Sequence, residues 1–137
     1  MRAFVLDNSV TMRWCFENGD NPYADGVLQR LGAGDQAIVP ILWLYEVVSV
    51  LTKAQRVGVI APDKADAFVD ALQSLGIVID DHGQDRVLSE VRDLARAHRL
   101  TGYDAVYLEL ALRRGLPLAT LDADLVRACR AAGGVVL

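Results

Sequence analysis

The sequence predicts an α/β fold in which helices cover both faces of a mostly parallel central sheet. The prediction rests on short apolar runs that alternate with longer stretches of helical periodicity. No linker, repeat or low-complexity tract interrupts this alternation. The 137 residues suffice for one hydrophobic core, so we expect a single domain spanning residues 1–137.

The first half of the chain predicts two strands and three helical segments. The strands are short runs of apolar residues bounded by polar ones. Proline marks two helix starts, at Pro22 and Pro40, and Gly32 ends the first of these helices. In order, we expect a strand at Ala3–Leu6, a helical turn at Ser9–Phe16, a helix at 21–32, a strand at Ala37–Val39 and a helix from Pro40 to about Arg56.

The second half continues the same alternation. Its amphipathic segment 84–99 presents Val87, Val91 and Leu94 on the inner face and arginines on the outer face. The acidic segment Asp80–Asp85 is interpreted as a solvated turn. In order, we expect a helix from Pro62 that Gly76 closes, a strand at Ile77–Ile79, helices at Gln84–Arg99 and Tyr103–Arg114, a strand at Leu116–Thr120, a helix at Ala123–Ala132 and an apolar end at Val135–Leu137.

Composition excludes several classes of protein. Hydrophobic residues make up 53% of the chain and charged residues 23%, which excludes intrinsic disorder. Cys15 and Cys129 are isolated, so neither a disulfide framework nor a redox motif is predicted. Pro40 and Glu46 interrupt the longest apolar run, so no membrane span is expected. We therefore expect a reduced, cytoplasmic protein without membrane contact.

Four carboxylates stand at the edges of core elements. Glu46 is the only charged residue between Gln36 and Lys53, and no basic residue lies one helical turn away to neutralise it. The others are Asp7 after the first strand, Asp104 in the first turn of a late helix, and Asp122 after a strand. Ligands of parallel α/β sheets bind beyond the carboxyl ends of the strands. The four acids thus predict a site for a divalent metal.

Each acid also has a structural interpretation. Asp104 follows Thr101 by three residues, as in a capping box, and Asp122 is placed to cap the last helix. Asp7 suits a turn, and Glu46 suits a buried pair with a distant arginine. The joint pattern favours the metal site, because the structural interpretation needs four separate coincidences.

The net charge of −4 at first argues against a nucleic-acid partner. Without the four site acids, however, the 18 acidic residues fall to 14, the number of Lys and Arg. A metal-filled acidic pocket would therefore leave a surface able to carry a basic track for phosphates.

Four segments resemble PIN-domain nucleases, and most closely the VapC-type toxins of bacterial type II toxin–antitoxin pairs. The segments are Phe4–Ser9, Pro40–Leu51, Leu100–Leu108 and Leu116–Asp122. They occur in the order and spacing of the family. The resemblance implies a PIN-like three-layer fold and a Mg²⁺- or Mn²⁺-dependent ribonuclease.

The resemblance also assigns roles to residues. It implies that Asp7, Glu46, Asp104 and Asp122 form the acidic set. Supporting roles fall to Ser9, Thr120, Asp124 and Ser49, of which Ser49 replaces an Asn that is common in the family. We expect this replacement to tune the site without inactivating it.

Carboxylate oxygens are hard ligands, so they favour Mg²⁺ or Mn²⁺ over zinc. A metal held by few carboxylates keeps waters, and one of these can act as the nucleophile in phosphodiester hydrolysis. We expect Asp7 and Asp104 to be the principal ligands. Glu46 and Asp122 are expected at a second or water-mediated position.

Two other classes of function remain open. A phosphoryl-transfer hydrolase also places an Asp after the first strand, but that pattern wants a second Asp where this chain has Ser9. A PIN-like module that binds RNA or protein without cutting is the other alternative. The complete acidic set argues against it.

A toxin requires an inhibitor in its own cytosol, and the resemblance implies an antitoxin of the VapB type. The aromatic residues near the first helices predict an apolar groove for an antitoxin helix. The candidates are Trp14, Tyr23 and Trp43, accompanied by Phe16 and Tyr45. A homodimer is expected as the toxin's own assembly.

Overall fold

The computed structural model describes residues 2–16 and 21–137. Its sheet has four strands, all parallel, in the order β3-β2-β1-β4. The strands are β1 (Ala3–Leu6), β2 (Gln36–Pro40), β3 (Ile77–Asp80) and β4 (Leu118–Ala119). The predicted parallel sheet is therefore confirmed. The apolar C-terminus contributes only an isolated bridge, between Leu118 and Val136, in place of a full strand.

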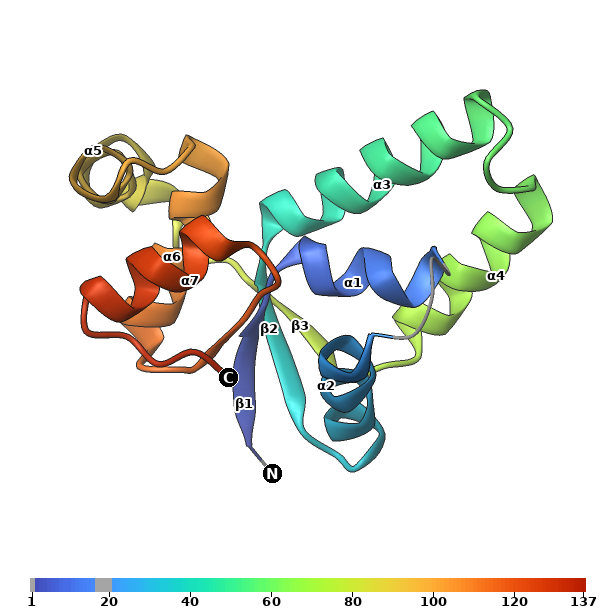
Figure 1. The fold of residues 1–137 in the computed structure, drawn as a ribbon, viewed down its shortest axis with the longest axis horizontal. Helices are drawn as coiled ribbons and strands as arrows, with labels where there is room; N and C mark the ends of the chain where they lie inside the picture. Colours follow the sequence, from blue (N-terminus) through green and yellow to red (C-terminus); the bar gives the residue numbers. More distant parts are fainter. Residues whose placement is uncertain (1, 17–20) are drawn as a thin grey trace.

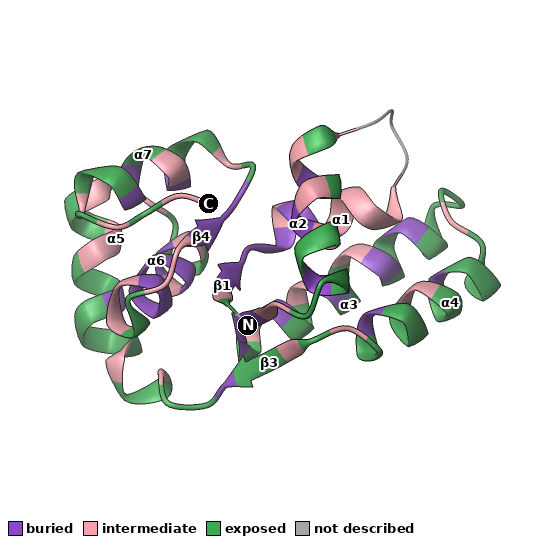
Figure 2. Ribbon diagram, turned by 90° about the horizontal axis from the view of Figure 1, so that it is seen from below, coloured by how far each residue is buried: buried purple, intermediate pink, exposed green. Residues whose placement is uncertain are grey.

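Helices cover both faces of this sheet, which makes the predicted three layers (Figure 1). Helices α1 to α4 lie on one side of the sheet, and α5 to α7 lie on the other. Their bounds are α1 (Asn8–Cys15), α2 (Pro22–Gly32), α3 (Ile41–Arg56), α4 (Pro62–Gln73), α5 (Arg92–His98), α6 (Gly102–Arg114) and α7 (Ala123–Ala131). Buried residues concentrate in β1 and in the inner face of α6, between the two helical layers (Figure 2).

Local sequence signals explain most of the helix ends. The side chain of Asn21 accepts a hydrogen bond from the amide of Ala24 at 2.9 Å, with Pro22 in the first turn, as predicted. The hydroxyl of Thr101 caps α6 in the same manner. Gly115 ends α6 with a φ of 62°, a left-handed conformation that suits glycine. Among the described residues, no helix is long and apolar enough to cross a membrane.

The segment predicted as one amphipathic helix, 84–99, is irregular in its first half. It begins as a 3₁₀ turn (Gln84–Arg86), continues as a π-helix (Val87–Val91) and becomes regular only in α5. The wider π turn shifts the face on which later residues lie. Val87, the first residue of the π turn, is exposed, so the prediction that it faces inward is wrong, whereas Val91 is buried as predicted.

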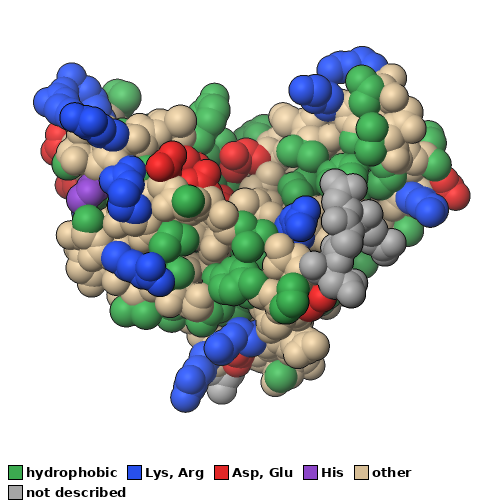
Figure 3. Space-filling view, viewed as in Figure 1, with side chains coloured by type: hydrophobic (Ala, Val, Ile, Leu, Met, Phe, Trp, Pro, Cys, Tyr) green, Lys and Arg blue, Asp and Glu red, His purple; other side chains and the backbone are tan. Residues whose placement is uncertain are grey.

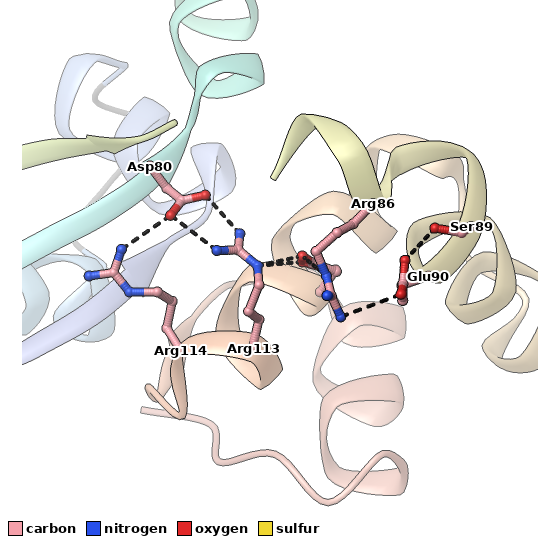
Figure 4. A network of polar contacts seen from close by, with 7 residues as sticks. Asp80, Arg86, Ser89, Glu90, Arg113 and Arg114 are labelled. Atoms are coloured by element: carbon pink, nitrogen blue, oxygen red, sulfur yellow. Dashed lines mark hydrogen bonds and ion pairs between the residues drawn. The ribbon is translucent and has the colours of Figure 1, made fainter. Parts of the chain in front are cut away.

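A buried ion network ties β3 to α6 (Figure 4). Asp80 accepts hydrogen bonds from Arg113 at 2.7 Å and from Arg114 at 3.1 Å. Glu109, also buried, pairs with Arg113 and with Arg86. The prediction that Asp80 belongs to a solvated turn is wrong, because its partners lie more than thirty residues away in sequence. Asp81, the next residue, is exposed as predicted.

Candidate active site

Sheet register places Asp7 beside Thr120. Strands β1 and β4 pair Val5 with Leu118 and Leu6 with Ala119, so the residues that follow each strand meet. The backbone amide of Asp7 donates to the carbonyl of Ala119 at 3.0 Å. The hydroxyl of Thr120 donates to Oδ2 of Asp7 at 2.7 Å.

A second hydroxyl holds the same carboxylate. Ser9, in the first turn of α1, donates to Oδ2 of Asp7 at 2.6 Å. Its oxygen also accepts from the amide of Leu121 at 3.0 Å, which links α1 to the loop after β4. Both hydroxyl bonds go to Oδ2, so they fix the carboxylate without engaging Oδ1. Asp7, Ser9 and Thr120 thus form one hydrogen-bonded unit, which brings together three of the residues named from the sequence.

Glu46 enters the site from α3, half-buried, and its partner is a tyrosine. The phenol of Tyr107 on α6 donates a short hydrogen bond to Oε1 of Glu46. Tyr107 is buried and lies one helical turn after Asp104, so both side chains lie on one face of α6. The partner of Glu46 is therefore a neutral tyrosine, and not the distant arginine of the structural interpretation.

The last two acids lie at helix starts. Asp104 is in the first turn of α6, where its amide donates to Thr101. Asp122 is the N-cap of α7, and its Oδ1 accepts from the amide of Leu125 at 3.0 Å. The capping interpretation is therefore correct for the positions of both residues. Asp124 is exposed in the first turn of α7, two residues after Asp122.

Electrostatics connects the four acids. Burial is the main reason that the pKa of Asp7 is raised, and the nearby charge of Asp122 adds to it, while the two hydroxyls act in the opposite direction. Burial likewise raises the pKa of Glu46, with contributions from Asp7 and Asp104. The pKa of Asp104 is raised by burial and by Asp122 and Asp7. The pKa values of Asp7, Glu46 and Asp104 are thus each raised in part by the charge of at least one other acid of the set.

Space-filling shows the same pocket as a notch in the molecule (Figure 3). Asp and Glu side chains gather in the notch, which lies between the two helical lobes. Among the described residues, no three Asp, Glu, His or Cys side chains are close enough to enclose a metal ion as they stand. The donor set nevertheless fits Mg²⁺ or Mn²⁺, because it is composed of carboxylate and hydroxyl oxygens. Without a metal ion between them, the like-charged carboxylates repel one another, which favours larger distances between them.

The other predicted residues differ in their surroundings. Ser49 is exposed on α3. Trp43 is only 4% exposed, and its indole donates to Thr11 at 3.0 Å, so it has little surface to offer a partner. The hydroxyl of Tyr23 donates to the carbonyl of Leu137. Trp14 is half-buried and lines an open groove between α1, α3 and α4.

Tyr107 is the site residue that the sequence reasoning missed. A signal was present, since a tyrosine within an apolar helix needs a partner for its hydroxyl. Glu46 was an acid without a local partner, and Tyr107 lies one turn from another predicted site acid. Pairing the two unsatisfied groups would have found the contact.

The curated relatives that this chain resembles include two proteins named Ribonuclease VapC3. The protein from Pyrobaculum aerophilum is 36% identical over 81 residues, or 59% of this chain and 62% of the relative. The protein from Mycobacterium tuberculosis is 36% identical over 83 residues, or 61% of this chain and 58% of the relative. The matched region thus spans about three fifths of each relative's length.

Solved structures show the same fold. PAE2754 from Pyrobaculum aerophilum has a TM-score of 0.70 at 24% identity, covering 98% of this chain and 83% of that one. VapBC2 from Rickettsia felis, in a complex with promoter DNA, has a TM-score of 0.71 at 13% identity, covering 98% and 97%. The family model of the PIN domain matches residues 4–131, which include the whole acidic set. This chain therefore belongs to the PIN-domain family.

Proposed function

We propose that this protein is a metal-dependent endoribonuclease and the toxin of a type II toxin–antitoxin pair. The observation that carries the proposal is the convergence of Asp7, Glu46, Asp104 and Asp122 on one pocket at the carboxyl edge of a parallel sheet, where three of them have raised pKa values. The similarity to proteins named Ribonuclease VapC3 supports the choice of RNA as substrate. We expect the protein to act in the cytoplasm.

Asp7 and Asp104 would hold Mg²⁺ or Mn²⁺ directly, with Glu46 and Asp122 at a second or water-mediated position. When bound, the metal supplies a nucleophilic water and stabilises the charge that develops on the phosphate oxygens. Ser9 and Thr120 orient Asp7 through their hydroxyl bonds. Tyr107 orients Glu46 toward the same pocket. We expect Ser49, three residues after Glu46 on α3, and Asp124, whose charge acts on Asp104, to contact metal-bound water or substrate.

The test is RNA cleavage by the purified protein. Total cellular RNA is incubated with Mg²⁺ or Mn²⁺, with EDTA and with the Asp7→Asn variant as controls. We expect cleavage that EDTA and the substitution each abolish. Binding of RNA without cleavage in any of these metals would favour the alternative of a non-cutting module. Hydrolysis of small phosphate esters without RNA cleavage would favour a phosphoryl-transfer hydrolase.

The apolar groove beside α1 is the proposed antitoxin site. Its lining includes Trp14 from α1, Phe16 and Val57 directly after α1 and α3, and Phe68 from α4, with Lys53 and Lys64 among them. Apolar residues between two cations suit an amphipathic helix that also carries acidic residues. Structures of VapBC2 and of a toxin–antitoxin complex from Klebsiella pneumoniae share the fold, which supports a partner of this kind.

We also propose a homodimer through the outer face of α3. Ile41, Leu44, Tyr45 and Val48 are spaced like one stripe of a helix, and each is at least 42% exposed. The edge strand β3 adds Ile79, which is exposed and lies near Leu44 and Val48 on the same side of the sheet. Exposed apolar patches of this kind mark interaction surfaces. Sedimentation should give a dimer for the unmodified protein and a monomer for Val48→Glu.

A further inference from the structure

Three arginines form a stripe along α5, next to the acidic pocket. Arg92, Arg96 and Arg99 are exposed; Arg92 and Arg96, four residues apart, lie on one side of the helix, and Arg99 follows as the C-cap residue of α5. We call these residues the arginine stripe. Figure 3 shows Lys and Arg side chains gathered on the α5 lobe, beside the notch that holds the acidic side chains.

Chain connectivity brings the stripe close to the pocket. Arg99 ends α5, and Thr101, two residues later, caps the helix that carries Asp104. Two virtual bonds of about 3.8 Å separate their Cα atoms, so these atoms are at most about 7.6 Å apart. From α7, Arg127 donates to the carbonyl of His98 at 3.1 Å and lies 3.8 Å from Asp124. A fourth guanidinium thus links the end of α5 to the rim of the pocket.

Arginines on this side of the molecule have two different environments. Arg86, Arg113 and Arg114 are paired with buried carboxylates in the network of Figure 4. By contrast, no carboxylate in the described part of the chain lies within ion-pair distance of a stripe arginine. The stripe arginines therefore have no ion-pair partner among the described residues.

The backbone at Arg99 gives an independent indication. Its φ of 55° and ψ of 46° are left-handed, and it is the only non-glycine residue in the described ranges with a positive φ. Helices commonly end with glycine in this conformation, because a Cβ atom is unfavourable there. Local strain of this kind concentrates at functional sites. A functional role of the Arg99 side chain would explain why arginine, and not glycine, occupies this left-handed position.

We propose that the arginine stripe binds the phosphate backbone of single-stranded RNA and leads the strand to the acidic pocket. This inference rests on the proposed nuclease function. Carboxylates repel phosphates, so the affinity of this protein for RNA requires cationic groups outside the pocket. Arg92 and Arg99 are seven residues apart, or about 10 Å along the helix, which matches about three stacked nucleotides. Arginine suits the task because its planar group binds phosphate oxygens in pairs.

A purely structural role makes a different prediction. Cations near the end of a helix stabilise it through the helix dipole. Removing Arg96 or Arg99 would then lower stability and leave RNA affinity unchanged. Binding and stability must therefore be measured on the same variants.

The first experiment measures RNA binding in an Asp7→Asn background, so that the probe is not cut. The variant Arg96→Gln/Arg99→Gln is compared with Arg2→Gln/Arg30→Gln, which removes the same charge from exposed residues at the opposite edge of the sheet. The probe is a short fluorescent single-stranded RNA, followed by anisotropy at several salt concentrations. The plot of log affinity against log salt should lose about 1.4 in slope, or about 0.7 for each phosphate contact.

If the affinities converge near 1 M salt, the same slope makes the stripe variant bind about 25-fold more weakly at about 0.1 M salt. The control should match the parent protein. If the stripe variant keeps the slope and affinity of the parent while the unmodified protein cleaves RNA, the RNA-binding role of the arginine stripe is overturned. The proposed nuclease function then still stands. An unmodified protein that neither binds nor cuts RNA would overturn both.

Arg99→Gly separates the two roles in one substitution. Glycine is favoured in the left-handed conformation, so the melting temperature of the variant should rise while its affinity for RNA falls. A lowered melting temperature with unchanged RNA affinity would mean that Arg99 is structural and would overturn the inference at that residue.

Discussion

At the scale of single residues, Asp7 is the most firmly held member of the acidic set. It is 5% exposed and accepts hydroxyl bonds from Ser9 and Thr120 on one oxygen. Hydrogen bonds to charged groups contribute about 1.5–3 kcal/mol each, which offsets part of the cost of burying a carboxylate. The result is an ionisable group with one oxygen held in place and the other left for a ligand.

Neutralising one acid should abolish cleavage and preserve the fold. Asp7→Asn and Asp104→Asn each remove a metal ligand, so we expect RNA cleavage to fall by about 10²-fold or more. Burial raises the pKa of both acids, so their ionised forms destabilise the folded state above the unfolded pKa of about 3.9. At pH 7 without metal, Asp104→Asn should therefore raise the melting temperature by about 2–4 °C.

Gel assays of RNA cleavage and thermal scans by circular dichroism measure both effects. Full cleavage by either variant would remove that residue from the site. A variant that fails to fold would instead favour the capping interpretation.

Tyr107 should act by positioning Glu46. In Tyr107→Phe the ring stays in the core, so the free energy of unfolding should fall by about 1.5–3 kcal/mol, the contribution of a hydrogen bond to a charged group. Without the phenol, Glu46 loses its orientation, and we expect about a tenfold fall in cleavage and a higher Mn²⁺ concentration for half-maximal activity.

The matched control is Tyr45→Phe, an exposed tyrosine of α3, which should change neither quantity. Metal titrations followed by thermal shift give a readout independent of cleavage. A Tyr107→Phe variant with unchanged metal response would show that the tyrosine only fills the core.

At the scale of elements, the network around Asp80 decides how β3 attaches to α6. Burial alone would raise the pKa of Asp80, but bonds from Arg113 and Arg114 outweigh it and hold the pKa below its ordinary value. The network joins the edge strand to the helix that carries Asp104 and Tyr107. It is therefore a structural support for the site and not part of its chemistry.

Asp80→Asn should destabilise the protein. Removing one partner of a buried pair costs about 3–5 kcal/mol, and we expect about 2–3 because the arginines keep some access to water. A lowered folded pKa gives stability that is present above the unfolded pKa of about 3.9 and lost as pH falls through the folded value. As the pH falls, the free energy of unfolding should therefore decrease less steeply in the variant than in the parent protein.

Urea denaturation between pH 3 and pH 7 measures this, with the exposed neighbour Asp81→Asn as control. The control should stay within about 0.5 kcal/mol of the parent. Equal losses in the two variants would contradict the network's role.

At the scale of the whole molecule, metal binding should be linked to folding. Metal binds the folded pocket and not the unfolded chain, so Mg²⁺ or Mn²⁺ at about 100 times its Kd should add about 2.7 kcal/mol of stability. Glu46→Gln should blunt the response, and Asp66→Asn, an exposed acid of α4, should not. Identical metal responses in the Glu46 variant and the parent would exclude Glu46 from the site.

The groove between α1, α3 and α4 should control antitoxin binding. Val57→Asp places a charge in the groove at a residue that is 62% exposed, so the fold should tolerate it and partner affinity should fall at least about tenfold. Trp14→Ala should weaken antitoxin binding more than it weakens RNA cleavage by the free protein. Val135→Asp, at a valine equally exposed outside the groove, is the control.

Affinity can be measured with the product of an adjacent small reading frame that encodes a DNA-binding domain with a helical tail. Unchanged affinity in the Val57 variant would place the partner elsewhere. A Trp14→Ala variant that loses cleavage or unfolds, with unchanged affinity, would assign Trp14 to the core, consistent with its bond to Ala24.

The sequence by itself determined the parallel α/β architecture and most helix starts. Local signals were sufficient, because apolar runs, Asn21-Pro22 and the Thr101 cap act within a few residues. The positions of Asp7, Asp104 and Asp122 at strand or helix ends followed from the same signals. The irregular start of the helix before α5 did not, because a π turn depends on how its neighbours pack.

Only the tertiary structure decided the partners of the buried polar groups. Glu46 is paired with Tyr107 and Asp80 with Arg113, across 61 and 33 residues of sequence. Both pairings depend on which helix face meets which strand end once the core has packed. Burial makes a polar group require a partner, but the partner is chosen by proximity in the folded chain, and that proximity is a property of the whole molecule.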